Sequence, residues 1–167
     1  MMVKHITGAA LAASVAAAFT APADAATTSA NLGVSATNSS TCTLSTSPVA
    51  FGTMNAVSGS SVDAAGSITV TCTNGTSWSA AADAGSGSGA TLATRKLVSG
   101  GNLLNYALYT DSARTNVWGD GSSGNSTLSG TGSGSAQNVT VYGRIAAGQT
   151  GAPAGSYSDT VSVTVTY

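Results

Sequence analysis

Apolar residues alternate with Ser, Thr or Gly in several short stretches of this chain, most clearly at its C-terminal end. In the stretch GSYSDTVSVTVTY, Val161, Val163, Val165 and Tyr167 alternate with hydroxyl residues. A period of two is that of a β-strand with one buried and one exposed face. Because the alternation continues to the last residue, we expect an edge strand whose missing neighbour another molecule supplies.

The same alternation recurs along the chain, with Gly-containing turns between the stretches, and predicts seven or eight strands. No helical period of 3.6 residues occurs after the N-terminal segment, so we expect an all-β antiparallel sandwich. The candidate stretches are SANLGVSAT, TCTLS, PVAFGTM, GSITVTCT, SWSAAAD, TLATRKLV, LLNYALYTD, QNVTVYGRIA and YSDTVSVTVTY, of which TLATRKLV is either a strand or an irregular edge. The predicted core consists of Phe51, Ile68, Val70, Trp78, Leu104, Tyr106, Leu108, Val139, Val141, Ile145, Val161, Val163 and Val165.

The first 25 residues have the three parts of a secretory signal peptide. A short basic start at Lys4 and His5 precedes an Ala-rich apolar run, and a small-x-small cleavage pattern ends at Ala25. The apolar run is shorter than the ~20 residues of a comfortable membrane span. We therefore expect an exported chain that is not an integral membrane protein; an N-terminal anchor or a buried helix is the alternative.

The rest of the chain has few residues suited to catalysis. It contains no Glu and no His, which excludes Ser–His–Asp chemistry. Asp83, Asp111 and Asp120 lie next to Gly, Ser or Thr, as turn residues do. No basic stripe indicates a nucleic-acid site. We expect no enzyme activity, no catalytic residues, no metal site and no cofactor.

Two cysteines, Cys42 and Cys72, are the only ones in the chain. In an exported protein such a pair predicts a disulfide. The alternatives are two free thiols or half of a metal site, but a structural zinc site would lack its other ligands. The Gly/Ser stretches at residues 85–90 and 130–137 predict mobile loops. The aromatic residues predict core packing, with a sugar-binding surface as the alternative.

Several longer stretches resemble the spore coat protein U domain family, which includes the subunits of archaic chaperone–usher pili. They are STCTLSTSPVAFGTMNA, GSITVTCTNG, LNYALYTDSARTNVWGDG and VTVYGRIAAGQTGAPAGSYSDTVSVTVTY. The resemblance implies an incomplete immunoglobulin-like antiparallel β-sandwich that is completed by a donor strand. It divides the chain into a signal peptide (1–25), an N-terminal donor extension (26–40) and the pilin domain (41–167).

The resemblance also implies a function and its partners. A pilin of this family polymerises by donor-strand exchange with neighbouring subunits, after a periplasmic chaperone has lent it a strand and an outer-membrane usher has exchanged it. This is recognition by β-strand addition. The chain would pass through the periplasm to a cell-surface fimbrium that serves adhesion and biofilm formation. Its acceptor-groove edge would be the strand with Val161, Val163, Val165 and Tyr167.

The segment before Cys42 has the alternation that a donor strand needs. Ala30, Leu32, Val34 and Ala36 are spaced by two residues and would face successive pockets of a groove. The alternative is that this segment is the first strand of the chain's own sheet. Two other functions use the same fold: a structural coat protein of a spore or cell surface, and a secreted carbohydrate-binding sandwich.

Overall fold

The computed structural model describes residues 23–167, and these contain strands but no helix. The chain divides into two units, one ending at Ala36 and one formed by residues 37–167. In the first unit, residues 23–36 have no regular secondary structure, and all of them are exposed. Nearly all of the predicted signal peptide lies outside the described residues, and the strand predicted at SANLGVSAT is absent.

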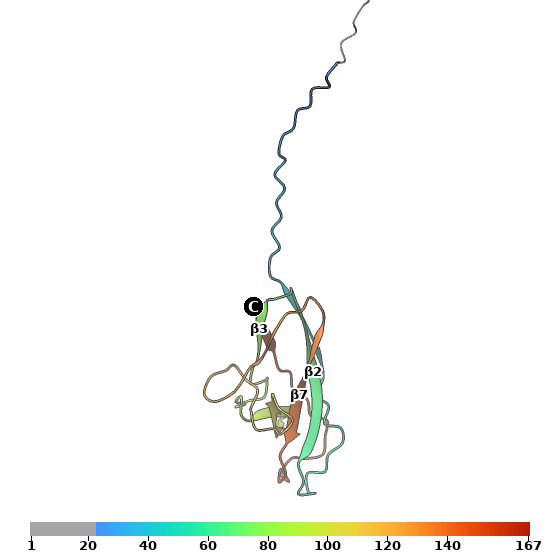
Figure 1. Ribbon diagram of the computed structural model, residues 1–167. Helices are drawn as coiled ribbons and strands as arrows, with labels where there is room; N and C mark the ends of the chain where they lie inside the picture. The colour runs from blue at the N-terminus through green and yellow to red at the C-terminus, as the bar shows by residue number, and fades with distance from the viewer. Residues whose placement is uncertain (1–22) are drawn as a thin grey trace, which may run out of the picture. The chain divides into compact units, whose positions relative to one another are not determined.

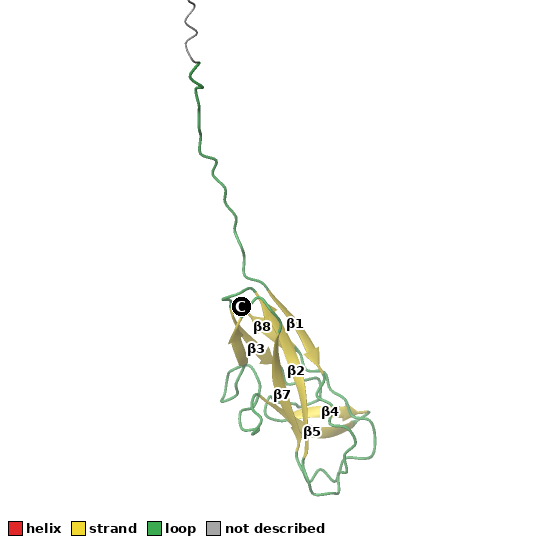
Figure 2. Ribbon diagram, turned by 45° about the vertical axis from the view of Figure 1, so that its right-hand side comes forward, coloured by secondary structure: helices red, strands yellow, loops and turns green. Residues whose placement is uncertain are grey.

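The second unit is a sandwich of two antiparallel sheets (Figures 1 and 2). The first sheet has the order β1–β2–β7–β5–β4, with β1 (Cys42–Ser47), β2 (Val62–Cys72), β7 (Gln137–Ile145), β5 (Asn102–Tyr109) and β4 (Arg95–Ser99). The second has the order β6–β3–β8, with β6 (Leu128–Thr131), β3 (Ser77–Ala82) and β8 (Val163–Thr166). Strands β4 and β5 turn across the direction of β1, β2 and β7 (Figure 2). The all-β antiparallel prediction is confirmed.

One hydrophobic core lies between the two sheets, and the alternating faces predicted from the sequence supply most of it. The predicted core residues that are buried are Ile68, Val70, Trp78, Leu104, Tyr106, Leu108, Val141 and Ile145. The others are partly buried and pack against that core: Phe51, Val139, Val161, Val163 and Val165. The core also contains residues that were not predicted, namely Cys72, Ala80, Ala82, Trp118 and Leu128.

The strand predicted at residues 48–54 is absent, and the one predicted at residues 157–167 is too long. Residues 48–54 form no strand; Pro48 has no N–H to donate, and Gly52 has a φ of +66°. At the C-terminal end, β8 covers only Val163–Thr166. The backbone N–H groups of Thr160 and Ser162 bond to the carboxylates of Asp159 and Asp83 instead of a strand.

Strand β6 was not predicted, because it is short and its last two residues belong to the stretch 130–137, which we expected to be a mobile loop. It pairs with β3, where Gly130 lies opposite Trp78. A Cβ atom at Gly130 would lie 2.7 Å from the Trp78 ring. Glycine therefore serves here as the surface on which a buried indole packs.

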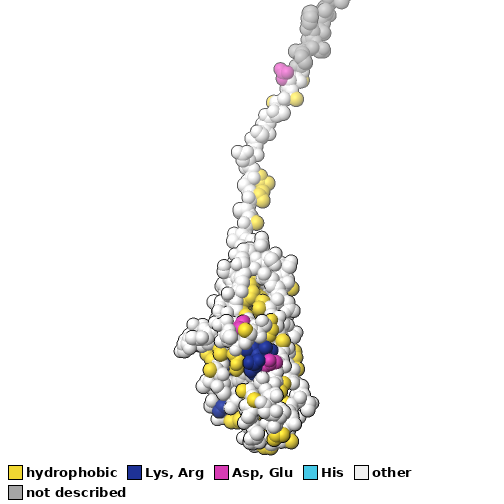
Figure 3. All heavy atoms as spheres, turned by 60° about the horizontal axis from the view of Figure 1, so that its bottom comes forward, with side chains coloured by type: hydrophobic (Ala, Val, Ile, Leu, Met, Phe, Trp, Pro, Cys, Tyr) yellow, Lys and Arg dark blue, Asp and Glu magenta, His cyan; other side chains and the backbone are white. Residues whose placement is uncertain are grey.

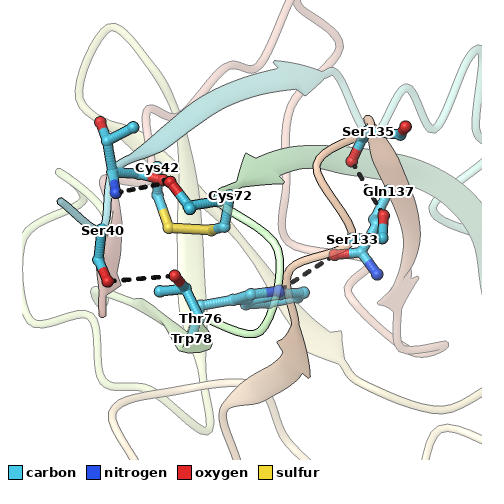
Figure 4. Close-up of a disulfide and its surroundings, with 10 residues drawn as sticks. Ser40, Cys42, Cys72, Thr76, Trp78, Ser133, Ser135 and Gln137 are labelled. Carbon is cyan, nitrogen blue, oxygen red and sulfur yellow. Dashed lines mark hydrogen bonds between the residues drawn. A yellow bond between two sulfur atoms is a disulfide. The ribbon is translucent and has the colours of Figure 1, made fainter. Parts of the chain in front are cut away.

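The predicted disulfide between Cys42 and Cys72 is present. The two residues are direct partners in the pairing of β1 with β2. Near them, Trp78 donates its indole N–H to Gln137 at 3.3 Å, and Thr76 bonds to Ser40 (Figure 4). The disulfide thus fixes the first residue of the edge strand β1 to the last residue of β2.

Replacing both cysteines by alanine should lower the free energy of unfolding by roughly 3–4 kcal/mol, because the disulfide closes a loop of about 30 residues in the unfolded chain. Urea denaturation followed by tryptophan fluorescence measures this, since Trp78 and Trp118 are both buried. Wild-type protein treated with a reductant is the control and should show the same loss. Equal midpoints for the oxidised wild type and the double variant would contradict the prediction.

Candidate functional site: an open groove between two strand edges

The main concave feature of the sandwich is a groove formed by two adjoining hollows, with volumes of about 290 and 570 Å³. One wall consists of residues 46–54 and the other of residues 155–163. Val49, Phe51, Leu97 and Asp159 line both hollows, so the two are continuous. We call this feature the groove.

The two walls of the groove run in opposite directions. The first hollow is lined by residues 46–51 and 159–163, and the second by residues 49–54 and 155–159. Along the groove, one wall therefore ascends in residue number while the other descends. An extended segment placed between them would be antiparallel to one wall and parallel to the other.

Core side chains form the floor of the groove. Ile68, Leu108, Trp118 and Val141 line its first hollow, beneath the half-buried apolar residues of the walls. On one wall, Phe51 packs edge-to-face on Tyr106 with ring centroids 6.0 Å apart. The first hollow is thus an opening into the hydrophobic core, whereas serine, threonine and glycine residues form much of the lining of the second.

Both walls continue into strands at the ends of their sheets. β1 pairs only with β2, and β8 pairs only with β3. An end strand presents backbone N–H and C=O groups that can bond to an added strand. In β8, Val163 and Val165 are half-buried while Thr164 and Thr166 are exposed. Val161 precedes β8 and Tyr167 follows it, with Tyr167 56% exposed.

A carboxylate lies where the two hollows meet. Asp159 Oδ1 accepts hydrogen bonds from the backbone N–H of Ser86 at 2.8 Å and from the Ser86 hydroxyl at 2.7 Å. Its Oδ2 accepts one from the Tyr106 phenol at 2.7 Å. Burial tends to raise the pKa of Asp159, but these hydrogen bonds outweigh it and hold the pKa below its ordinary value. Burial and Asp159 raise the pKa of Tyr106 far above its ordinary value.

Tyr106→Phe should lower the free energy of unfolding at neutral pH by roughly 1–3 kcal/mol, because it removes a hydrogen bond to a carboxylate. The pKa of Asp159 is lowered in the folded state, so its stabilising contribution is present above the pKa of the unfolded carboxyl, about 3.9. That contribution is lost as the pH falls through the folded value.

The deficit of Tyr106→Phe relative to wild type should therefore shrink in acid. Urea denaturation at a series of pH values measures it, and the comparison cancels the other carboxylates with lowered pKa values, such as Asp111. A deficit that stays constant down to the lowest pH would show that the lost phenol acts through packing alone.

One arginine, Arg95, is fully buried and forms hydrogen bonds to three separate segments of the sandwich. The side chain of Arg95 is 0% exposed and donates to the carbonyl oxygens of Asp83 (2.9 Å), Leu92 (2.9 Å) and Trp118 (2.8 Å). These bonds join β4, the loop after β3 and the segment after β5. Burial lowers the pKa of the guanidinium, which still remains charged at neutral pH.

The four apolar residues of the predicted donor strand lie in the first unit. Leu32 is 87% exposed and Val34 is 88% exposed. Ala30 and Ala36 are exposed as well. Large apolar side chains are rarely left this open, so these two are available for burial elsewhere.

The turn aspartates have the local role predicted for them. Asp83 accepts the N–H of Gly85, Asp120 that of Ser122, and Asp111 those of Thr115 and Asn116. Within residues 23–167, no three His, Cys, Asp or Glu side chains gather in a way that could hold a metal ion. In the same residues, no helix is long and apolar enough to cross a membrane.

Charged side chains are few on the face shown in Figure 3. On the outer side of the first sheet, Asp63 pairs with Arg144 at 2.7 Å and with Arg114 at 3.3 Å. Arg114 also lies over the ring of Tyr142, 5.8 Å from its centroid. The hydrogen bond from Arg144 is the main cause that lowers the pKa of Asp63. Such exposed pairs contribute little to stability.

Asp159 and Arg95 were not predicted as residues of the site. The signal for Asp159 was its position: it has the same parity as Val161 and Val163, so a strand pattern turns it inward. Arg95 likewise has the parity of Leu97, which lines the groove. A charged residue at an inward position of an alternating stretch is the pattern that could have found both.

Two antiparallel sheets with an open groove between their end strands define an immunoglobulin-like β-sandwich that is open on one side. The chain belongs to the Spore Coat Protein U domain family, whose family model matches residues 28–164. The resemblance found in the sequence is thereby confirmed. No curated protein matches the chain.

A solved structure shares the fold. It is the CsuC–CsuE chaperone–tip adhesion subunit pre-assembly complex from archaic chaperone–usher Csu pili of Acinetobacter baumannii. One of its chains is similar to this chain, with a TM-score of 0.57 and 22% sequence identity. The similarity covers 77% of this chain and 40% of that one, so this chain spans less than half the length of the chain it matches.

Proposed function

We propose that this protein is a structural subunit of an archaic chaperone–usher pilus and polymerises by donor-strand exchange. In this proposal, residues 30–36 of one subunit insert into the groove of the next. The observation that carries it is the groove itself, an opening into the core between two end strands. A strand inserted there would cover core side chains and bond to bare strand edges at once.

The exposed leader is suited to be the inserted segment. Its inward positions are Ala30, Leu32, Val34 and Ala36, and an alternating segment presents one such side chain every second residue. Fully burying Leu32 and Val34 would contribute roughly 1.5–3 kcal/mol each. The alanines would contribute less and would fit where the groove is shallow.

The proposal includes the partners and the location implied by the family. Before assembly, an open groove would be an aggregation hazard, and a periplasmic chaperone would cover it by lending a strand. An outer-membrane usher would then exchange that strand for the leader of the next subunit. Residues 1–25 would direct export and be removed, and the finished fimbrium would serve adhesion and biofilm formation at the cell surface.

Deleting residues 26–35, or replacing Leu32 by Asp, should abolish fibres, because an unpaired charge cannot enter the apolar groove. Electron microscopy of cells and polymer ladders on unboiled SDS gels measure this. The matched control is Asn31→Asp, which adds the same charge to the leader at a position of opposite parity and should still polymerise. Both leader variants should still co-purify with the chaperone, because the chaperone binds the groove.

Fibres formed by the deletion variant would overturn the proposed role of the leader. Loss of fibres in Asn31→Asp as severe as in Leu32→Asp would overturn the proposed inward positions.

A further inference from the structure

The groove contains one charged residue. All other described residues that line its two hollows are apolar, hydroxyl-bearing or glycine, and Asp159 lies where the hollows join. A single carboxylate in such a groove acts mainly on the groups that come close to it. Any strand that fills the groove has to pass this carboxylate.

The hydrogen bonds of Asp159 leave it charged and partly open. Oδ1 accepts three hydrogen bonds, two from Ser86 and one from the N–H of Thr160. Oδ2 accepts only that of the Tyr106 phenol, and a carboxylate oxygen can accept two. Next to Oδ2 lies Gly85, where a Cβ atom would come within 2.1 Å of that oxygen. The absence of a side chain at this glycine keeps the carboxylate in place.

The positive charge of the buried Arg95 does not neutralise the negative charge in the groove. The formal charges of Arg95, Asp83 and Asp159 sum to −1. The Arg95 guanidinium donates its hydrogen bonds to three backbone carbonyl oxygens and not to the carboxylate of Asp83 or Asp159. The groove therefore presents a net negative charge at its midpoint.

The leader segment that we propose to fill the groove has no charged side chain. Residues 26–41 contain no Asp, Glu, Lys or Arg. An uncharged strand can fill an apolar groove and also offer a backbone N–H to Oδ2. A strand with a carboxylate at the position opposite Asp159 would meet like charge, which costs several kcal/mol at an interface.

We infer that Asp159 is a specificity-determining residue of the groove. It admits a strand that brings a small, neutral or basic side chain opposite it, and it rejects one that brings an acidic side chain. This inference rests on the proposed donor-strand exchange and adds to it a rule for which leaders a subunit accepts.

The test is a charge scan of the leader in the full chain. Asp or Lys replaces each inward residue in turn (Ala30, Leu32, Val34 and Ala36), and polymer is quantified on unboiled SDS gels. At the position opposite Asp159, the Lys variant should form at least about tenfold more polymer than the Asp variant. At the other positions both charges should block assembly equally.

The same variants combined with Asp159→Asn provide the matched control. Asparagine keeps the shape and the Oδ1 acceptor but removes the charge, so the Lys–Asp difference should disappear. If Asp159→Asn fails to fold, the Lys–Asp contrast in the wild-type groove decides alone. Equal loss for Lys and Asp at every position would overturn the inference but support donor-strand exchange. Unchanged polymer in all eight leader variants would overturn the proposed function itself.

Discussion

Replacing Arg95 by Met should lower the free energy of unfolding by roughly 3–5 kcal/mol, one of the largest losses expected for a single substitution in this domain. Three carbonyl oxygens, those of Asp83, Leu92 and Trp118, would lose their donor together. Each unsatisfied buried group costs about 1–3 kcal/mol. Methionine would fill much of the volume, so the loss would come mainly from the missing donors and the missing charge.

Urea denaturation of the purified chain measures this loss through the fluorescence of Trp78 and Trp118. Trp118 is a sensitive reporter, because its carbonyl bonds to Arg95 and its indole N–H bonds to Ala80. Lys96→Met is the matched control: it removes a neighbouring cation whose ammonium bonds only to the carbonyl of Ser88 in an exposed loop. A loss for Arg95→Met no greater than that of the control would show that Arg95 is not structurally required.

The strands with strict alternation were the part of the fold that the sequence predicted well. In β2 and β7, buried residues occupy every second position because both faces of the pattern are consistent: one faces the other sheet and one faces out. In β5, Leu104, Tyr106 and Leu108 are buried as predicted, but Ala107 between them is buried as well. The disulfide was equally predictable, since an exported chain with a lone cysteine pair has one possible connectivity.

The segments that line the groove were harder to predict, and for a physical reason. Alternation in residues 48–54 and 157–162 shows which side chains face the core. Residues 48–54 form no strand, and residues 157–162 pair with a strand only at Ser158, opposite Val98 of β4. Carboxylates take the place of a neighbouring strand at Thr160 and Ser162. Sequence periodicity reports burial, whereas a strand requires backbone pairing, and the two diverge where a sheet is open.

Arg95 and Asp159 illustrate a second limit. From an alternating pattern alone, a charged residue at an inward position is not expected to be buried. Here, Arg95 is buried and Asp159 half-buried, because each has hydrogen-bond partners from other segments of the chain. Ser86 lies 73 residues from Asp159 and Trp118 lies 23 residues from Arg95. Partners at such separations come together only in the folded chain, so the role of these residues could not be predicted before the structure.

Filling the groove from within the same chain should stabilise the protein strongly. A variant that lacks residues 26–35 and carries the segment SANLGVSAT after Tyr167, joined by a short Gly/Ser linker, should fold as a monomer. A short turn after β8 brings the added strand back antiparallel to it. Because the walls run in opposite directions, the same strand would then be parallel to residues 46–54.

The gain in the free energy of unfolding should be at least about 3 kcal/mol, from burial of the added Leu and Val alone. Each new backbone hydrogen bond would add about 0.5–1.5 kcal/mol. The added strand would lie over the half-buried side chains of Val161, Val163 and Val165, so these side chains should become less exposed to solvent. Urea denaturation and size-exclusion chromatography measure the two expected results, higher stability and a monomeric state.

The matched control is the same variant with Asp in place of the Leu and Val of the added segment. It has the same length, linker and end point, so any stabilisation that it shows is unrelated to the apolar side chains. A gain in the first variant that is absent from the control would support the insertion of this segment into the groove. Equal stability of the two variants would mean that residues 30–36 are not the strand that the groove accepts, whatever else the leader does.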